Sequence, residues 1–184
     1  KAKFEGDLGR VYGVQWRKWR RPFMDPNVDQ LENLIKGLKE DPNGRRHVIT
    51  AWNPGELDAM ALPPCHMFAQ FYVNKKRELS CHMYQRSVDV FLGLPFNIAS
   101  YALFTHMIAQ VCDLGVGELI ISMGDTHVYK NHLEQVTEQL KRHPMQSPTL
   151  MLNSSIKDIN KFTMNDINLI NYTSHGQIKA EMAV

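Results

Sequence analysis

The chain has 184 residues, of which 43% are hydrophobic and 22% are charged, a composition typical of one globular domain over residues 1–184. A net charge of +2 gives no support for a nucleic-acid-binding protein, and neither a membrane-spanning apolar run nor a signal peptide is recognisable. The three cysteines, Cys65, Cys81 and Cys112, lack the spacing of a disulfide framework. We therefore expect free thiols and a cytoplasmic protein. Because the chain starts at Lys1 and enters a motif within a few residues, we also expect a fragment or a processed product.

The N-terminal part predicts loops around one amphipathic helix. Residues 6–13 are rich in glycine and indicate a loop. Residues 15–21 interleave aromatic and cationic side chains, which favours an anchored surface loop over a nucleic-acid patch. Residues 29–39 repeat leucine and isoleucine at helical spacing, with Asp29 as the N-cap.

A pair of adjacent arginines precedes the first predicted strand, residues 47–52. Arg45 and Arg46 suit a solvated strand entry, and they would also suit an anion clamp because a guanidinium can grip phosphate with two bonds. The sequence alone leaves both interpretations open.

A lone cysteine follows two prolines in the middle of the chain. Pro63 and Pro64 stiffen the approach to Cys65 and bias it away from helix. Such a cysteine either packs in the core without reacting or acts as a nucleophile. The adjacent Cys-His pairs at 65–66 and 81–82 do not predict a metal site, because neighbouring strand residues face opposite ways.

Strands outnumber helices in the remaining sequence, so the fold class expected is α+β, a mixed sheet packed with helices. The central helix is expected to contain His106 as a core histidine. The predicted elements are strands at 66–73 and 78–84 around a hairpin loop at 74–77, a helix at 95–114, a strand at 118–123 that breaks at 124–125 and resumes over 126–129, a helix at 131–141, a one-turn helix near Asn165, and strands at 149–152, 169–172 and 178–182.

Several stretches together resemble the folate-dependent thymidylate synthases. They are PCH at 64–66, YQRSVD at 84–89, LGLPFNIASY at 92–101 and GDTHVY at 124–129. Any one alone is weak, but four in this order are specific, and the likeness extends over nearly the whole chain.

The resemblance implies reductive methylation of dUMP to dTMP, with 5,10-methylenetetrahydrofolate as the co-substrate and no metal. Cys65 would add to C6 of the pyrimidine as a thiolate, which a cation such as Arg86 would favour. Tyr12 resembles the tyrosine that helps to remove the C5 proton. The catalytic residues implied are Cys65, Tyr12, Asn97, Arg86 and Asp89.

The resemblance also implies two binding sites and a homodimer that forms through the sheet. Arg45 and Arg46 would reach the phosphate site of the partner subunit, and Asn97 would read the uracil edge. The full dUMP set implied is Arg45, Arg46, Gln85, Arg86, Ser87, Val88, Asp89, Gly93, Asn97, His127, Val128 and Tyr129. The folate set implied is Asp89, Leu92, Gly93, Phe96, Ala183 and Val184.

The sequence departs from the family by lacking its amino-terminal portion, which carries a phosphate-loop arginine, a catalytic glutamate and tryptophans near the reacting methylene. Two alternatives therefore stay open. One is a dUMP or dCMP hydroxymethylase of the same fold, in which water replaces hydride. The other is a noncatalytic RNA-binding or interaction protein that uses the basic aromatic segment.

Overall fold

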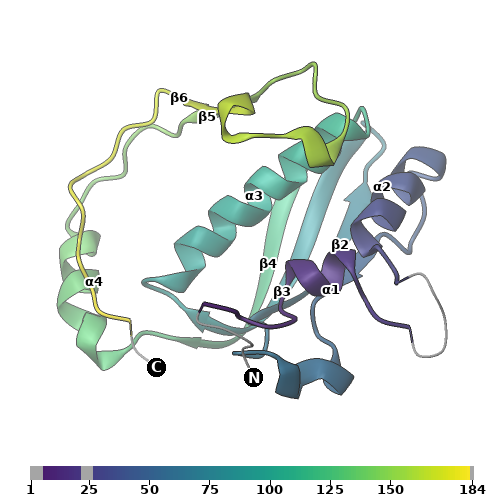
Figure 1. The fold of residues 1–184 in the computed structure, drawn as a ribbon. Coiled ribbons are helices and arrows are strands. Elements are labelled where there is room, and N and C mark those ends of the chain that lie inside the picture. The colour runs from purple at the N-terminus through teal and green to yellow at the C-terminus, as the bar shows by residue number, and fades with distance from the viewer. Residues whose placement is uncertain (1–5, 22–26, 183–184) are drawn as a thin grey trace.

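The computed structural model describes residues 6–21 and 27–182, and its centre is a four-stranded sheet crossed by one long helix (Figure 1). The helices are α1 (Gly13–Arg17), α2 (Gln30–Glu40), α3 (Gly93–Val111) and α4 (Leu133–Leu140). The strands are β1 (Val48–Thr50), β2 (His66–Val73), β3 (Glu78–Asp89), β4 (Gly115–His127), β5 (Thr149–Leu152) and β6 (Ile167–Ile170). Short 3₁₀ helices lie at Pro54–Ala59, Lys130–His132, Ile159–Lys161 and Met164–Asp166.

The order of the sheet is β1-β2-β3-β4, antiparallel in the first two pairs and parallel between β3 and β4. A parallel pair needs a long crossover, and α3 supplies it by running back across one face of the sheet (Figure 1). As a consequence, the carboxyl ends of β3 and β4 meet at one edge, with Asp89 opposite His127. The amino end of β2 joins them there, because His66 pairs with Gln85.

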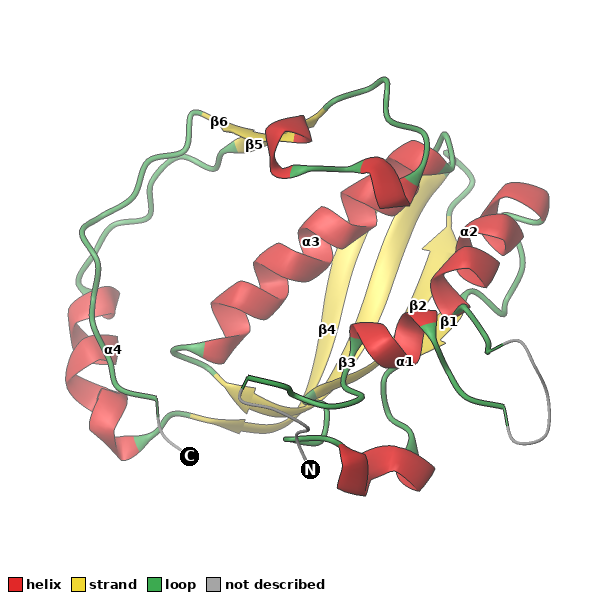
Figure 2. Cartoon of the chain, in the orientation of Figure 1, coloured by secondary structure: helices red, strands yellow, loops and turns green. Residues whose placement is uncertain are grey.

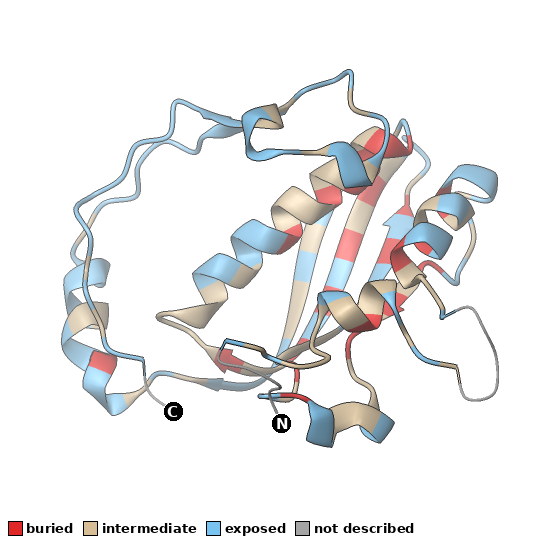
Figure 3. Ribbon diagram, in the orientation of Figure 1, coloured by how far each residue is buried: buried red, intermediate tan, exposed pale blue. Residues whose placement is uncertain are grey.

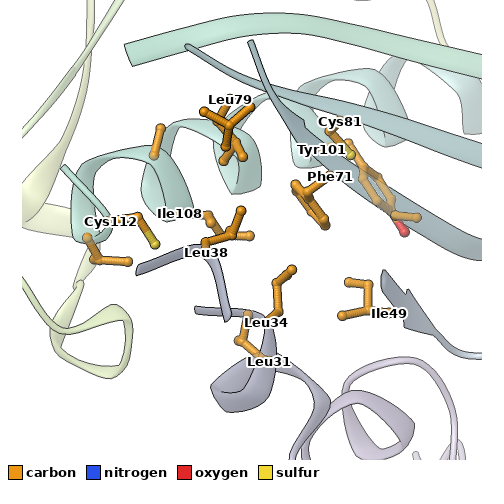
Figure 4. Packing of buried hydrophobic residues seen from close by; sticks show 14 of the residues in the cluster. Leu31, Leu34, Leu38, Ile49, Phe71, Leu79, Cys81, Tyr101, Ile108 and Cys112 are labelled. Atoms are coloured by element: carbon orange, nitrogen blue, oxygen red, sulfur yellow. The ribbon is translucent and has the colours of Figure 1, made fainter. Parts of the chain in front are cut away.

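The core lies between the sheet and its helices (Figures 3 and 4). Side chains alternate along β2, where Ala69, Phe71 and Val73 are buried. In α2, leucines at helical spacing (Leu31, Leu34, Leu38) pack against this face, together with Ile108 of α3. Asp29 caps α2 by accepting a 2.9 Å bond from the Glu32 N–H, as the sequence predicted.

The opposite face of the sheet carries exposed apolar side chains. Tyr72 is 62% exposed and Ile120 is 46% exposed, and Phe68 and Tyr84 are exposed on the same face. A groove of about 390 Å³ crosses this face between Tyr72 and Ile120. This face therefore mixes exposed apolar side chains with polar ones, among them Gln70, Ser80 and His82.

The bounds of β3 and β4 differ from those that the sequence predicted. β3 continues to Asp89 rather than ending at residue 84, because its parallel partner β4 pairs with it as far as His127. The predicted break at Gly124 is wrong. A Cβ there would lie 2.8 Å from the Arg86 carbonyl oxygen, so this glycine permits close approach of two strands. Because β4 ends at His127, Tyr129 lies just beyond the strand, not on its face.

The aromatic basic segment, residues 15–21, is a loop only in part, because residues 15–17 belong to a helix and residues 18–21 lie outside the helices and strands. Residues 13–17 form α1, and the Trp16 ring stacks on Phe104 of α3 at a centroid distance of 5.4 Å. Two of its cations pair with carboxylates: Arg17 with Asp29 at 2.8 Å, and Arg20 with Glu56 at 3.1 Å.

The central helix begins two residues earlier than predicted, at Gly93, and ends at Val111, so Asn97 lies in its second turn. His106 is half-buried and lies outside the core, contrary to the prediction, although burial lowers its pKa. The predicted strand at 47–52 is confined to β1, Val48–Thr50.

The C-terminal part forms an arm beside the sheet (Figure 2). β5 and β6 pair antiparallel near the predicted positions, and a 3₁₀ turn covers Asn165. The predicted strand at 178–182 is wrong: this segment is held by side chains instead, and the His132 Nε2–H donates to the Glu181 carbonyl at 2.7 Å. None of the helices in the described residues is long and apolar enough to cross a membrane.

Candidate active site

The polar residues singled out in the sequence gather at one edge of the sheet. Cys65 precedes β2, the stretch 85–89 ends β3, and His127 ends β4, while α3 starts beside them and brings Asn97. The parallel pairing of β3 and β4 is what places these segments together.

The backbone of Cys65 is held from both sides. Its N–H donates to the Tyr12 hydroxyl at 3.0 Å, and its carbonyl accepts from the Arg86 N–H at 2.9 Å. Pro64 before it is buried. The thiol is half-buried, at a fixed position on the rim of the sheet.

The Arg86 side chain braces the same turn. Its Nε–H donates to the Pro64 carbonyl at 3.0 Å, and Nη2 donates to the Pro63 carbonyl at 2.8 Å. The guanidinium carbon lies 5.7 Å from the centre of the Trp52 ring, a cation–π distance. A guanidinium has five N–H donors, so donors remain for an anion.

The groups beneath Cys65 are neutral at physiological pH. Burial raises the pKa of Tyr12, although the bond from the Cys65 N–H opposes this. Burial lowers the pKa of His66 to about 4 and raises that of Tyr101. The Tyr12 ring stacks on His66 at 4.1 Å, and His66 Nδ1 bonds to the Tyr101 hydroxyl at 2.9 Å. The Tyr12 phenol therefore keeps its proton beside the thiol.

The other two cysteines are packing residues. Burial raises the pKa of Cys81 to about 12 and that of Cys112 to about 11. A thiolate is disfavoured at both, whereas Cys65 is the more accessible thiol.

Hydrogen bonds made by side-chain amides connect β3 to α3. The Gln85 side-chain amino group donates to the Ser87 carbonyl and to Asn97 Oδ1, both at 3.0 Å. Gln85 is 2% exposed. Asn97 Nδ2 makes no bond within the part of the chain that the structure describes.

The acidic residue of the motif shapes the entry to α3. Asp89 Oδ1 accepts from the N–H groups of Phe91 and Leu92, at 3.1 and 3.2 Å. Its second carboxylate oxygen has no bond within the described residues. Gly93 follows, and a Cβ there would lie 3.4 Å from the Asp89 Cβ.

The histidine and tyrosine of the GDTHVY stretch lie in contact. Their rings meet edge to face, with centroids 4.9 Å apart, and His127 Nδ1 lies 3.3 Å from Asp125 Oδ1. Val128 between them is exposed. Val88 on β3 is fully buried, although it does not belong to the main hydrophobic cluster.

The paired arginines are not at this edge. Arg45 and Arg46 are exposed, and neither has a bonding partner among the described residues. The Phe71 N–H donates to the His47 carbonyl at 2.8 Å, which places Arg46 near the far end of β2. At about 3.3 Å per residue along a strand, that is roughly 20 Å from Cys65.

Two clefts adjoin the start of α3. One of about 720 Å³ lies between Leu92, α4 and the segment 177–181. Another of about 920 Å³ is lined by Leu92, Phe96 and Leu140, and Phe96 is 74% exposed. Cys65 lines neither cleft. Ala183 and Val184 lie outside the described residues.

Among residues 6–21 and 27–182, no group of three or more His, Cys, Asp or Glu side chains could hold a metal ion. Sequence reasoning did not anticipate Trp52, His66 or Tyr101 around the thiol. Only the fold brings Trp52 against Arg86, and no local pattern marks it.

Comparison with known proteins decides the family. The family model described as thymidylate synthase matches residues 2–184. This chain belongs to the thymidylate synthase family. A Staphylococcus haemolyticus protein described as thymidylate synthase is 55% identical over 185 residues, an alignment that covers 100% of this chain and 57% of that relative. The resemblance and the α+β mixed sheet expected from it are confirmed. The chain spans 57% of the length of this thymidylate synthase.

Proposed function

We propose that this chain carries the nucleotide site of a thymidylate synthase, which methylates dUMP reductively with 5,10-methylenetetrahydrofolate. The observation that carries this proposal is the bracing of Cys65 by Tyr12 and Arg86. Both backbone groups of the cysteine are bonded, and a guanidinium holds the two carbonyls before it. A fixed, accessible thiol beside a cation is what a cysteine nucleophile requires.

The chemistry proposed for these residues is covalent catalysis. The Cys65 thiolate forms a bond to C6 of the uracil, and the electron pair of the C5–C6 double bond makes C5 a carbon nucleophile. C5 bonds to the methylene of the folate and then loses its proton. Tyr12, protonated and bonded to the Cys65 N–H, is placed to orient that proton transfer. The bond between the methylene carbon and N5 of the folate then breaks, which leaves an exocyclic methylene on C5 and releases tetrahydrofolate. Tetrahydrofolate gives a hydride to the methylene as the Cys65–C6 bond breaks, and it departs as dihydrofolate.

The nucleotide would lie along the sheet edge. The free donors of Arg86 and the Ser87 hydroxyl suit the phosphate, Asn97 suits the uracil edge, and His127 with Tyr129 suits the ribose hydroxyl. The second carboxylate oxygen of Asp89, which has no bond within the described residues, and the clefts beside Leu92 and Phe96 suit the folate. Gly93 would lie next to it, and Ala183 and Val184 would close over it.

A homodimer is part of the proposal. Arg45 and Arg46 lie about 20 Å from Cys65 along β2, too far to reach a phosphate bound beside it in the same subunit. The exposed apolar side chains on one face of the sheet, such as Tyr72 and Ile120, support pairing of two copies through the sheet. A two-fold axis there would bring the arginines of one copy to the other. Three free thiols suit a cytoplasmic protein.

The test is product analysis after incubation with dUMP and methylenetetrahydrofolate. Chromatography separates dTMP from 5-hydroxymethyl-dUMP and so distinguishes the synthase from a hydroxymethylase. The assay is run on this chain and on this chain supplemented with the part of the relative that it does not span. We expect dTMP with an equal amount of dihydrofolate. The hydroxymethyl product, or no product from either sample, would contradict the proposal.

A further inference from the structure

The base-reading amide, Asn97, could present its edge in either of two orientations. Its oxygen can accept from uracil N3–H while its amino group donates to O4, and a flipped amide would match cytosine instead. To discriminate uracil from cytosine, the site therefore needs a neighbouring residue that holds the Asn97 amide in one orientation.

We infer that Gln85 is that neighbour, a positioning residue that sets the base specificity of the proposed dUMP site through Asn97. Both hydrogens of its side-chain amino group are used: one goes to the Ser87 carbonyl and the other to Asn97 Oδ1, each at 3.0 Å. This inference rests on the proposed function, and it gives Gln85 a role that does not require contact with the nucleotide.

We call these two hydrogen bonds, from Gln85 to Ser87 and from Gln85 to Asn97, the relay. The donor and the acceptor of the first bond cannot exchange roles. The Ser87 carbonyl belongs to the backbone of β3 and cannot exchange acceptor for donor. A flipped Gln85 would turn its oxygen toward two acceptors and lose two bonds. Its own oxygen, Oε1, is buried without a partner in the described part of the chain, so a flip would also leave the amino group there without an acceptor. The observed orientation of Gln85 is thus strongly favoured.

The second link follows from the first. With the amino group of Gln85 pointing at Asn97, a flipped Asn97 would set two donors against each other. Asn97 therefore keeps its oxygen toward Gln85, and its amino group is left for the ligand. A carbonyl oxygen has two lone pairs, so Oδ1 can still accept from uracil N3–H. Because Gln85 is only 2% exposed, water has little access to replace its hydrogen bonds.

The experiment compares the dissociation constants for dUMP and dCMP by titration calorimetry. Wild type is expected to prefer dUMP by about tenfold or more, the usual consequence of one unmatched buried bond. Gln85→Met removes both donors and frees Asn97 to flip, so the preference should shrink by about tenfold. Gln85→Glu replaces the two donors with acceptors and should shift the ratio further toward dCMP.

Gln110→Glu is the matched control. The amino group of Gln110 also donates to two carbonyls, those of Asn153 and Ile156, at 2.9 and 3.0 Å, but it lies away from the sheet edge. Its ratio should equal that of wild type. In an Asn97→Ala background, Gln85→Met should leave the ratio unchanged, because the relay has lost its last member.

The outcomes separate the two proposals. If both Gln85 variants weaken dUMP and dCMP binding equally, Gln85 is merely structural and the relay is wrong, while the proposed function stands. If wild type binds neither nucleotide, the proposed function fails and the relay with it. Should Gln85→Met not fold, proton exchange in wild type decides. Both Gln85 side-chain amide protons are expected to exchange slowly in nuclear magnetic resonance spectra, and fast exchange of either overturns the relay.

Discussion

Replacing Arg86 by lysine is expected to loosen the turn that carries Cys65. The guanidinium donates to the carbonyls of Pro63 and Pro64 at once, at 2.8 and 3.0 Å. An ammonium on a flexible stem cannot reproduce that fork, so at least one bond is lost.

The loss can be sized from the bonds themselves. A hydrogen bond from a charged donor contributes about 1.5–3 kcal/mol, and the half-buried Arg86 allows water to replace part of it, which leaves about 1–2 kcal/mol. For a chain of this length that corresponds to a melting temperature lower by about 2–8 °C. Scanning calorimetry measures this effect.

Arg77→Lys is the matched control, because Arg77 lies exposed in the turn between β2 and β3. It should melt within about 1 °C of wild type, as surface substitutions usually do. Alkylation of Cys65 by iodoacetamide gives a second readout, and Arg86→Lys should change its rate because the turn and the nearby charge both change. If Arg86→Lys melts with the control and alkylation is unchanged, the guanidinium does not brace the nucleophile.

Three further predictions concern the shared site, pH and the base. Mixing an Arg45→Ala, Arg46→Ala double variant with a Cys65→Ser variant should restore about a quarter of wild-type activity, since half of randomly formed dimers would hold one intact site. Stability should fall as pH drops from 6.5 toward 4, because the pKa of His66 is about 4 in the folded chain and the unfolded chain takes up the proton first. The contribution of neutral His66 to the free energy of unfolding is at most about 3 kcal/mol and is fully present above pH 6.5. His66→Gln should therefore reduce the slope of melting temperature against pH. Asn97→Asp should shrink or invert the ratio of kcat/KM for dUMP over dCMP.

Each of these three predictions has a result that would contradict it. If mixing restores no activity, the two subunits do not share arginines. A His66→Gln slope equal to that of wild type would show that His66 is not the group titrating, and His175→Gln, at an exposed histidine, serves as the control. An unchanged nucleotide ratio in Asn97→Asp would mean that another residue reads the base.

The sequence predicted the elements best where a local pattern decides them. The leucine spacing and Asp29 cap of α2 are set by near neighbours, and so is the turn between β2 and β3. The extension of β3 to Asp89 was missed because pairing with β4, a strand distant in the chain, keeps it extended. Gly124 was misread for the same reason, since only the neighbouring strand shows why a side chain is excluded there.

The site followed a similar division. The motif residues Cys65, Arg86 and Asn97 could be named from the sequence, because the resemblance marks them. Their bonds could not be, since the partners of Cys65 include Tyr12, 53 positions away, and the bond from Gln85 to Asn97 crosses from strand to helix. Such contacts depend on how the sheet and α3 pack, which no spacing in the chain encodes.

The most direct test of the account is covalent trapping at Cys65. The protein, alone and supplemented with the remaining part of the relative, is incubated with 5-fluoro-dUMP and methylenetetrahydrofolate and then analysed by peptide mass spectrometry. Fluorine at C5 cannot leave as a proton does, so the bond between Cys65 and C6 should persist. The account predicts an adduct on the Cys65 peptide, none on Cys81 or Cys112, and none in Cys65→Ser. An adduct that survives in Cys65→Ser, or no adduct in either wild-type sample, would contradict it.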